Sequence, residues 1–139
     1  MDRAELSARR WAETWARGWA THDAASIAAL YADDAVFVSE PFRAPARPAE
    51  YAEWAFADEV RAEVWFAEPL GDRDRASVAW WAISESVDGR ATTLAGVSTL
   101  WFDAAGLVTR QFDYWNAAED AAQPPPDGWG PVAAHERPD

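Results

Sequence analysis

The sequence contains no cysteine and only two histidines, His22 and His135. The missing thiols exclude disulfides, cysteine nucleophiles and cysteine-ligated metal sites. Two histidines are too few for a histidine-rich metal site, and the carboxylates form no recognisable calcium-binding loop. Glycines are also scarce, and Gly71, Gly89 and Gly106 fall in expected turns rather than in a phosphate-binding motif. We therefore expect no metal and no other cofactor.

Long apolar runs and clusters of basic residues are missing as well. No stretch approaches the ~20 apolar residues that cross a bilayer, and the opening residues 1–5 are charged, unlike a signal peptide. The net charge is −12, from 24 acidic and 12 basic residues. Such an acidic surface repels phosphate backbones and anionic lipid headgroups. We expect a cytoplasmic protein with no nucleic-acid and no membrane partner.

Tryptophan, in contrast, is abundant, with ten copies among 139 residues. The length suits one domain, which buries about two-thirds of its surface on folding. A buried indole needs a hydrogen-bond partner for its N–H group, so burying a tryptophan without one costs free energy. This excess predicts either a thick aromatic core or the wall of a cavity.

Three helices are predicted in the first half of the chain. The first spans residues 4–20 and carries three tryptophans spaced four residues apart along one face. Asp23 is a good N-cap for a second helix over residues 24–31, which the pair Asp33-Asp34 ends. The third helix spans residues 48–56, with a proline in its first turn.

The remaining segments alternate as strands do. The predicted strands span residues 35–39, 60–68, 76–87, 91–102 and 107–116. Asp88-Gly89 is a two-residue hairpin signal, so the last three strands form an antiparallel meander. Helices followed by such a meander indicate an α+β fold. A long twisted sheet curls, which predicts a hollow between the sheet and the helices.

A change in composition predicts where the domain ends. Residues 1–118 form the expected domain, and residues 119–139 form a tail rich in proline and glycine. The run from Gln123 to Pro131 cannot form a regular element, and Trp129 is the residue able to hold it against the body.

Asp113 is the leading candidate for chemistry. It lies inside the last predicted strand, where aspartate is disfavoured, on the same face as Trp115. A carboxylate on an aromatic-walled face is partly desolvated, which raises its pKa and suits an acid or base near neutral pH. The alternative is a structural aspartate that accepts from an indole N–H or pairs with Arg110 or Arg43.

Two blocks of sequence resemble a known family. Residues 19–37, with Trp19-Ala20-Thr21-His22-Asp23, resemble the start of SnoaL-like proteins of the nuclear transport factor 2 superfamily. Residues 102–116, with Asp113-Tyr114-Trp115-Asn116, resemble the end, so the likeness covers about residues 8–117. It implies a cone-shaped curved mixed sheet with three helices (an α+β roll), a deep pocket and a homodimer. Members include polyketide cyclases, ketosteroid isomerase, limonene-epoxide hydrolase and scytalone dehydratase, so fold alone does not settle function.

The resemblance also implies site residues. Asp113 falls where the SnoaL-like cyclases and the epoxide hydrolase have their catalytic aspartate, and Glu40 falls near the base of ketosteroid isomerase. Ser39 competes with Glu40 for that place, and a solvated loop glutamate is the alternative. The oxyanion-hole tyrosine and acid of the isomerase are replaced by Trp15 and Ser98. The epoxide hydrolase has an Arg-x-Asp pair on a middle strand, and no such pair exists here around Trp80-Trp81-Ala82.

Together these observations predict a pocket for a small apolar or aromatic, ring-containing molecule. Asp113, with Glu40 second, would perform acid/base chemistry: isomerisation, cyclisation, dehydration or hydrolysis. The alternative is a non-catalytic ligand-binding or dimerisation module in which the tryptophans are core. Expected substrate-binding residues are Trp15, Trp19, Tyr31, Arg43, Trp54, Trp80, Ser98, Trp115 and Asn116.

Overall fold

A computed structural model describes residues 2–129 as three helices and a six-stranded sheet. The helices are α1 (Arg3–Thr21), α2 (Ala24–Ala28) and α3 (Pro48–Phe56). The strands are β1 (Tyr31–Val38), β2 (Glu59–Phe66), β3 (Leu70–Asp72), β4 (Arg75–Ser86), β5 (Ala91–Phe102) and β6 (Val108–Glu119). The predicted α+β class, with its curved sheet, is confirmed.

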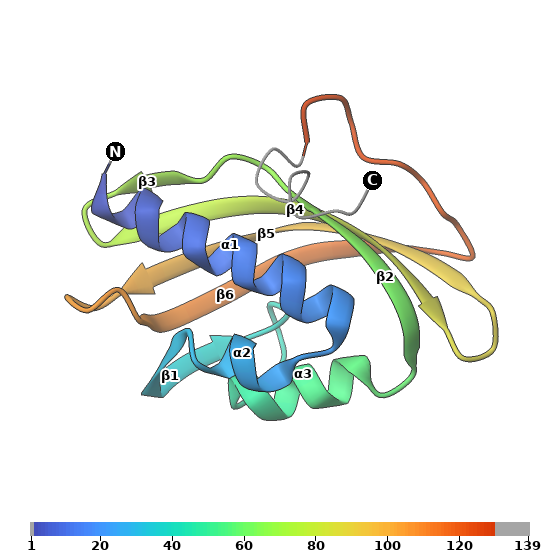
Figure 1. Ribbon diagram of the computed structural model, residues 1–139, viewed down its shortest axis with the longest axis horizontal. Coiled ribbons are helices and arrows are strands. Elements are labelled where there is room, and N and C mark those ends of the chain that lie inside the picture. Colours follow the sequence, from blue (N-terminus) through green and yellow to red (C-terminus); the bar gives the residue numbers. More distant parts are fainter. Residues whose placement is uncertain (1, 130–139) are drawn as a thin grey trace.

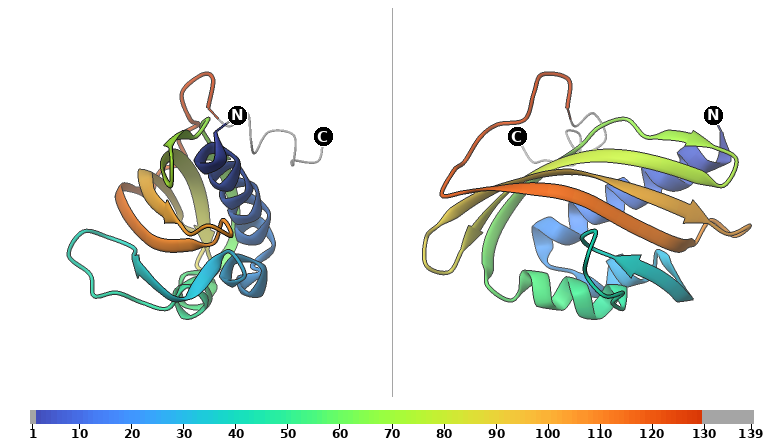
Figure 2. Two further views of the ribbon diagram at one scale, coloured as in Figure 1. Left: turned by 90° about the vertical axis from the view of Figure 1, so that its left-hand side faces the viewer. Right: turned by 180° about the vertical axis from the view of Figure 1, so that it is seen from behind.

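The sheet is mixed and strongly curved. Its order is β1-β6-β5-β4-β2, with β3 beside β4; β1 runs parallel to β6 and all other neighbours are antiparallel. The long strands bend around α1, and α3 lies at the side where β2 curls away from its neighbours (Figure 1, Figure 2). The cone therefore has one face covered by helices. No helix among residues 2–129 has the length and apolar character needed to cross a membrane.

Helix α1 forms the back of the cone because its apolar face repeats every three to four residues. Asp2 caps its start by accepting from the Ala4 amide at 2.7 Å, and the chain leaves it through His22 in the left-handed region. Trp11 and Trp15 of this face are buried against the sheet. The predicted helix and its tryptophan stripe therefore position the side chains that the site uses.

The second helix is shorter than predicted, and the first strand begins earlier. The sequence pattern predicts a helix to Tyr31 and a strand from residue 35, but Tyr31 already pairs with Val108 of β6. The Val108 amide donates to the Leu30 carbonyl at 2.9 Å, which draws the chain into the sheet. Asp33-Asp34 lies in an irregular, exposed part of β1 rather than at a helix end. A long-range pairing thus overrides a local helical pattern.

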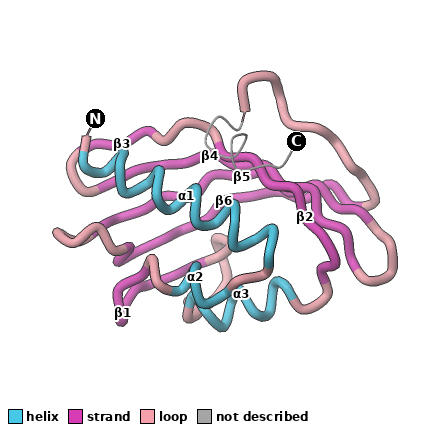
Figure 3. The backbone as a smooth tube through the Cα atoms, in the orientation of Figure 1, coloured by secondary structure: helices cyan, strands magenta, loops and turns pink. Residues whose placement is uncertain are grey.

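The ends of the sheet hold two further differences from the prediction. The expected turn at Pro69-Leu70-Gly71-Asp72 contains the short strand β3, and β6 continues to Glu119 instead of residue 116. After β6 the chain turns back as a loop toward β4 (Figure 3). There Trp81 Nε1 donates to the Gln123 carbonyl at 2.9 Å, and the Trp81 and Trp129 rings lie 6.0 Å apart. The described part of the tail is therefore held on the sheet, as predicted from Trp129; His135 lies outside the described residues.

Candidate functional site

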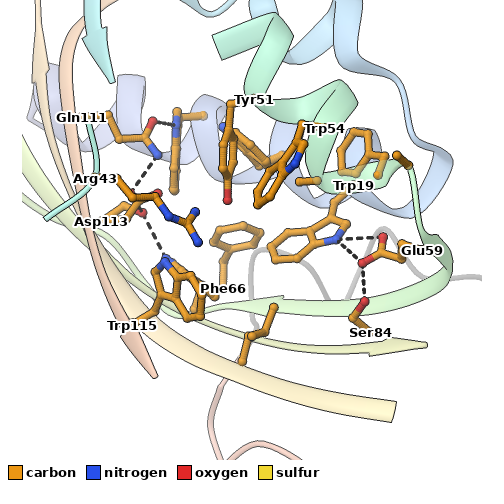
Figure 4. Close-up of a pocket in the computed structure, with 18 of the residues that line it drawn as sticks. Trp19, Arg43, Tyr51, Trp54, Glu59, Phe66, Ser84, Gln111, Asp113 and Trp115 are labelled. Carbon is orange, nitrogen blue, oxygen red and sulfur yellow. Dashed lines mark hydrogen bonds between the residues drawn. The ribbon is translucent and has the colours of Figure 1, made fainter. Parts of the chain in front are cut away.

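A cavity of about 360 Å³ opens between the concave sheet, α1 and α3. Eight of the residues predicted to form the site line it: Trp15, Trp19, Arg43, Trp54, Trp80, Ser98, Asp113 and Trp115. Its other large or polar lining residues are Trp11, Tyr51, Phe56, Asp58, Glu59, Phe66, Ser84, Leu94 and Gln111. The walls are mostly aromatic rings, with Asp113 and Glu59 on opposite sides (Figure 4). The expected tryptophan-rich hollow therefore exists, and it is open to small molecules of suitable size.

Asp113 lies on β6, directly across from Ser98 on β5, with only 7% of its surface exposed. Its Oδ1 accepts from Ser98 Oγ at 2.7 Å and from Gln111 Nε2 at 2.9 Å. Among the described residues, none donates a hydrogen bond to Oδ2, and none forms an ion pair with this carboxylate. One oxygen is therefore anchored, while the other is left for a molecule in the cavity.

The first support for Oδ1 is a chain of donors that starts on α1. Trp15 Nε1 donates to the Tyr31 hydroxyl at 3.0 Å, and that hydroxyl donates to Gln111 Oε1. Trp11 Nε1 also donates to Gln111 Oε1, at 3.1 Å. Because an indole N–H can only donate, these bonds turn the Gln111 carbonyl toward the helix and its amide nitrogen toward Asp113.

The second support comes from within the sheet. Trp80 Nε1 donates to Ser98 Oγ at 3.0 Å, so the Ser98 hydrogen is directed to Asp113. The indole again acts as a pure donor that fixes the direction of a hydroxyl. The sequence also allowed a structural Asp113 that accepts from an indole N–H; in the structure the indole of Trp80 reaches Asp113 through Ser98. Among the described residues, Asp113 forms no ion pair with Arg110 or Arg43.

Burial dominates the titration of this carboxyl. Removal from water raises the pKa of Asp113 to about 6, against the opposing effect of the hydrogen bonds from Ser98 and Gln111. Burial also raises the pKa of Tyr31, which stays a neutral hydroxyl donor. Asp113 therefore changes charge near neutral pH, as the sequence pattern predicts for a base on an aromatic face.

Arg43 is the cation at the cavity. Its guanidinium lies 5.4 Å from the centre of the Trp54 ring and 5.7 Å from that of Trp115, which is cation–π distance. It also donates to Ser39 Oγ at 3.1 Å and pairs with Glu40 at 2.9 Å. Two indoles thereby hold a positive charge on the same side of the cavity as Asp113 (Figure 4).

Tyr51 of α3 points its hydroxyl into the cavity toward Arg43 (Figure 4). Burial, together with the negative charge of Asp113, raises the pKa of Tyr51 to about 12. The hydroxyl therefore keeps its proton at all physiological pH values. Tyr51 and Arg43 together supply donors next to the Asp113 carboxyl.

Glu59, the first residue of β2, forms a second polar group in the wall of the cavity. Its Oε1 accepts from His22 Nε2 at 2.9 Å, and both of its oxygens accept from Trp19 Nε1 at 3.1 Å. Ser84 Oγ donates to Oε2 at 2.5 Å. The carboxylate is 7% exposed, and the His22 ring is stacked on Phe56. This cluster ties α1, β2 and β4 together beside the cavity.

Three predicted site residues lie outside the cavity. Glu40 is bound to Arg43 with a half-exposed side chain, because the loop after β1 turns it away from the sheet. Tyr31 is buried behind the wall and acts through Gln111. Asn116 is exposed, since strand alternation places it on the opposite face from Trp115.

The indole donors also differ from expectation. Trp15 and Trp80 are among the predicted substrate-binding residues, but their N–H groups donate to Tyr31 and Ser98 instead. The Trp115 N–H is bound too, to the Ser39 carbonyl at 2.5 Å. These tryptophans present rings, not donors, to the cavity.

Sequence reasoning missed Gln111, Glu59 and Ser84. Gln111 shares the strand face of Asp113, so alternation was a usable signal for it. Glu59 and Ser84 carried no signal, because strands far apart in the chain bring them together. In the part of the chain that the structure describes, no three His, Asp or Glu side chains gather as metal ligands would; the expectation of a site without a cofactor stays a prediction.

Comparison with known proteins gives a consistent picture of the fold. A family model described as the SnoaL-like domain matches residues 9–111. RV0760c of Mycobacterium tuberculosis aligns with a TM-score of 0.67 at 22% identity, over 86% of this chain and 97% of that one. The Delta 5-3-ketosteroid isomerase from Mycobacterium sp. aligns at 0.66 and 20% identity, over 86% and 99%.

A third solved structure is that of SalBIII, an epoxide hydrolase/cyclase-like enzyme in pyran ring formation in polyether salinomycin. It aligns with a TM-score of 0.71 at 11% identity, over 84% of this chain and 98% of that one. At these identities the structures establish a shared fold. No match to this chain was found among curated protein sequences.

Proposed function

The chain belongs to the SnoaL-like domain family, and we propose that it is an enzyme in which Asp113 performs acid/base chemistry on an apolar, ring-containing molecule. One observation carries the proposal. The buried Asp113 lines the cavity, Ser98 and Gln111 donate to its Oδ1, and no described residue donates to its Oδ2.

The proposed step is proton transfer at carbon. Ionised Asp113 removes a proton from the carbon next to a ring carbonyl, and the electron pair moves to the carbonyl oxygen as an enolate. The Tyr51 hydroxyl and the Arg43 guanidinium stabilise the charge that develops on that oxygen. Protonated Asp113 then returns the proton to the same or a neighbouring carbon, so atoms and charge balance without a cofactor.

The substrate class follows from the walls. Aromatic faces from α1, α3 and the sheet surround the cavity, and the indole N–H groups of Trp15, Trp80 and Trp115 are bound inside the protein. Such walls suit flat apolar rings. Structural relatives include a protein crystallised with estradiol-17beta-hemisuccinate and a designed 17-OHP binder, which supports a ring-containing ligand here.

Hydrogen–deuterium exchange into 2-tetralone, a bicyclic ketone with acidic C–H bonds, tests the proposal. We expect the wild type to catalyse exchange with a rate that rises with pH through about 6, the pKa to which burial raises Asp113. Asp113→Asn should reduce the catalysed rate at least 100-fold, and Asp34→Asn, at an exposed position of β1, should not. An Asp113→Asn rate equal to that of the wild type would contradict the proposal.

The second candidate is a non-catalytic binding module. It is favoured by the commitment of the Trp15, Trp80 and Trp115 N–H groups to the protein, which leaves walls suited to holding a ligand without activating it. Calorimetric binding of 2-tetralone without catalysed exchange would favour this function over the enzyme.

We also propose a homodimer formed through the outer face of the sheet. Val97 and Tyr114 pair across β5 and β6, and they are 37% and 50% exposed on that face. Burying them against a second copy would remove apolar surface from water. Sedimentation should show a dimer for the wild type and a monomer for Val97→Lys; a monomeric wild type would contradict this assembly. The cytoplasmic location and the lack of nucleic-acid and membrane partners stay predictions from the sequence.

A further inference from the structure

The cavity has a second polar wall that the proposed chemistry at Asp113 does not use. Ser84 of β4 lines the cavity, and its Oγ lies 2.5 Å from Glu59 Oε2. Glu59 is an acceptor that is almost completely buried. Figure 4 shows this pair on the opposite side of the cavity from Asp113, with aromatic rings between them.

The hydrogen of Ser84 is committed by this geometry. A serine hydroxyl has one hydrogen to donate and two lone pairs that accept. Glu59 takes that hydrogen, and Glu59 itself is held in place by Trp19 Nε1 at 3.1 Å and His22 Nε2 at 2.9 Å. Ser84 therefore presents only acceptor lone pairs to the cavity. A ligand atom that reaches it must bring a hydrogen.

The hydrogen bond from Ser84 to Glu59 persists because no other described residue replaces Ser84 as a close donor to Oε2. Its oxygens already accept from Trp19, His22 and Ser84, which belong to different elements of the fold. Rotating the Ser84 hydroxyl toward a ligand would leave Glu59 Oε2 without its shortest hydrogen bond. Oε2 would then keep only its 3.1 Å bond from Trp19 Nε1, and weakening the hydrogen bonding of a buried carboxylate costs free energy.

We propose that Ser84, oriented by Glu59, is a binding point selective for a hydrogen-bond donor, such as a hydroxyl or amine, at the end of the ligand remote from Asp113. This inference rests on the proposed function in that the reacting carbonyl end lies at Asp113. It narrows the substrate class to a rigid ring system with a carbonyl at one end and a donor group at the other. An ether or ketone oxygen at the remote end would place its lone pairs against those of Ser84 Oγ, so such ligands should bind more weakly.

Three ketones that differ at one position test the proposal: 6-hydroxy-2-tetralone, 6-methoxy-2-tetralone and 2-tetralone. Isothermal titration calorimetry on the full chain should show the hydroxy compound binding about tenfold more tightly than the methoxy compound. Ser84→Ala should bring this ratio close to one. Ser86→Ala, a matched change outside the cavity on the same strand, should leave it at the wild-type value.

The outcomes separate this inference from the enzyme proposal. Equal binding of the hydroxy and methoxy ketones by the wild type would overturn the donor-selective point, and so would a hydroxyl preference that survives in Ser84→Ala. Hydroxyl-selective binding without catalysed deuterium exchange would sustain the binding point while removing the enzyme proposal. Failure of all three ketones to bind would overturn both. If Ser84→Ala does not fold, the wild-type series and Ser84→Thr, which should keep the preference, decide the question.

Discussion

Ser98 and Asp113 face each other across β5 and β6, and Ser98 Oγ donates to Asp113 Oδ1 at 2.7 Å. This bond connects an indole in the sheet, Trp80, to the carboxyl at the cavity. Since the second bond to Oδ1 comes from Gln111 of β6, both strands of the pair orient the carboxyl.

Asp113→Asn should make the protein more stable at alkaline pH. The pKa of Asp113 is raised from 3.8 to about 6 on folding, so below about pH 4 the carboxyl carries a proton in both states. The free energy of unfolding falls as the pH rises from about 4 through 6, because the carboxyl of the folded state then becomes a desolvated charge. A shift of about two pKa units corresponds to about 3 kcal/mol.

Urea unfolding at pH 4 and pH 8 measures this effect. We expect Asp113→Asn to exceed the wild type by about 1–3 kcal/mol at pH 8, with little difference at pH 4. Asp34→Asn removes the same charge from an exposed side chain and controls for net charge. An Asp113→Asn difference that is the same at both pH values would contradict a buried, titrating carboxyl.

Ser98→Ala should raise the pKa of Asp113 further. The hydrogen bond from Ser98 lowers the pKa of the carboxyl, so its removal leaves desolvation less opposed. The change also leaves the Trp80 N–H without its acceptor, at a cost of about 1–3 kcal/mol. A carboxyl titration followed by NMR checks the direction. Thr99→Val, on the opposite face of the same strand, should leave the pKa of Asp113 unchanged, and a downward shift in Ser98→Ala would count against the assignment.

Gly96→Ala should disturb the curvature of the sheet. A Cβ at Gly96 would lie 2.3 Å from the Tyr114 carbonyl oxygen and 2.5 Å from Trp115 Cβ, and the backbone cannot yield cheaply. Overpacking of this kind costs about 1–3 kcal/mol or more. Thermal unfolding should show a clear loss of stability, larger than for Gly89→Ala, where a Cβ meets no atom and only a positive φ is strained. Equal losses would show that the close approach at Gly96 is not limiting.

Thr93→Val should release the start of the tail from the sheet. Thr93 Oγ1 donates to the Ala121 carbonyl at 2.8 Å and accepts from the Gln123 amide at 3.0 Å, and valine has nearly the same shape without these bonds. Hydrogen exchange of the Gln123 amide should accelerate at least tenfold, the equivalent of about 1.4 kcal/mol. Thr92→Val, with the same change next to it, should leave that exchange rate alone. Unchanged exchange in Thr93→Val would show that the remaining contacts, the Trp81 bond to the Gln123 carbonyl and the Ala121 amide bond to the Ala91 carbonyl, hold the tail without Thr93.

Most of the elements were predictable because their signals are local. The stripe of tryptophans on α1, the proline in the first turn of α3 and the turn at Asp88-Gly89 each depend on neighbours a few residues away. The error at Tyr31 arose where a distant strand, β6, supplied the deciding hydrogen bonds. Local pattern cannot report a partner that far along the chain.

The sequence by itself determined the fold class, the aromatic character of the cavity and the face on which Asp113 lies, because periodicity sets which side chains share a face. Only the tertiary structure decided what those side chains do. Glu40 lies outside the cavity and pairs with Arg43, and Tyr31 lies behind the cavity wall, where it donates to Gln111. Glu59 of β2 accepts a hydrogen bond from Ser84 of β4. Desolvation and the direction of a hydrogen bond depend on atoms brought together from distant segments. They exist only once the chain is packed.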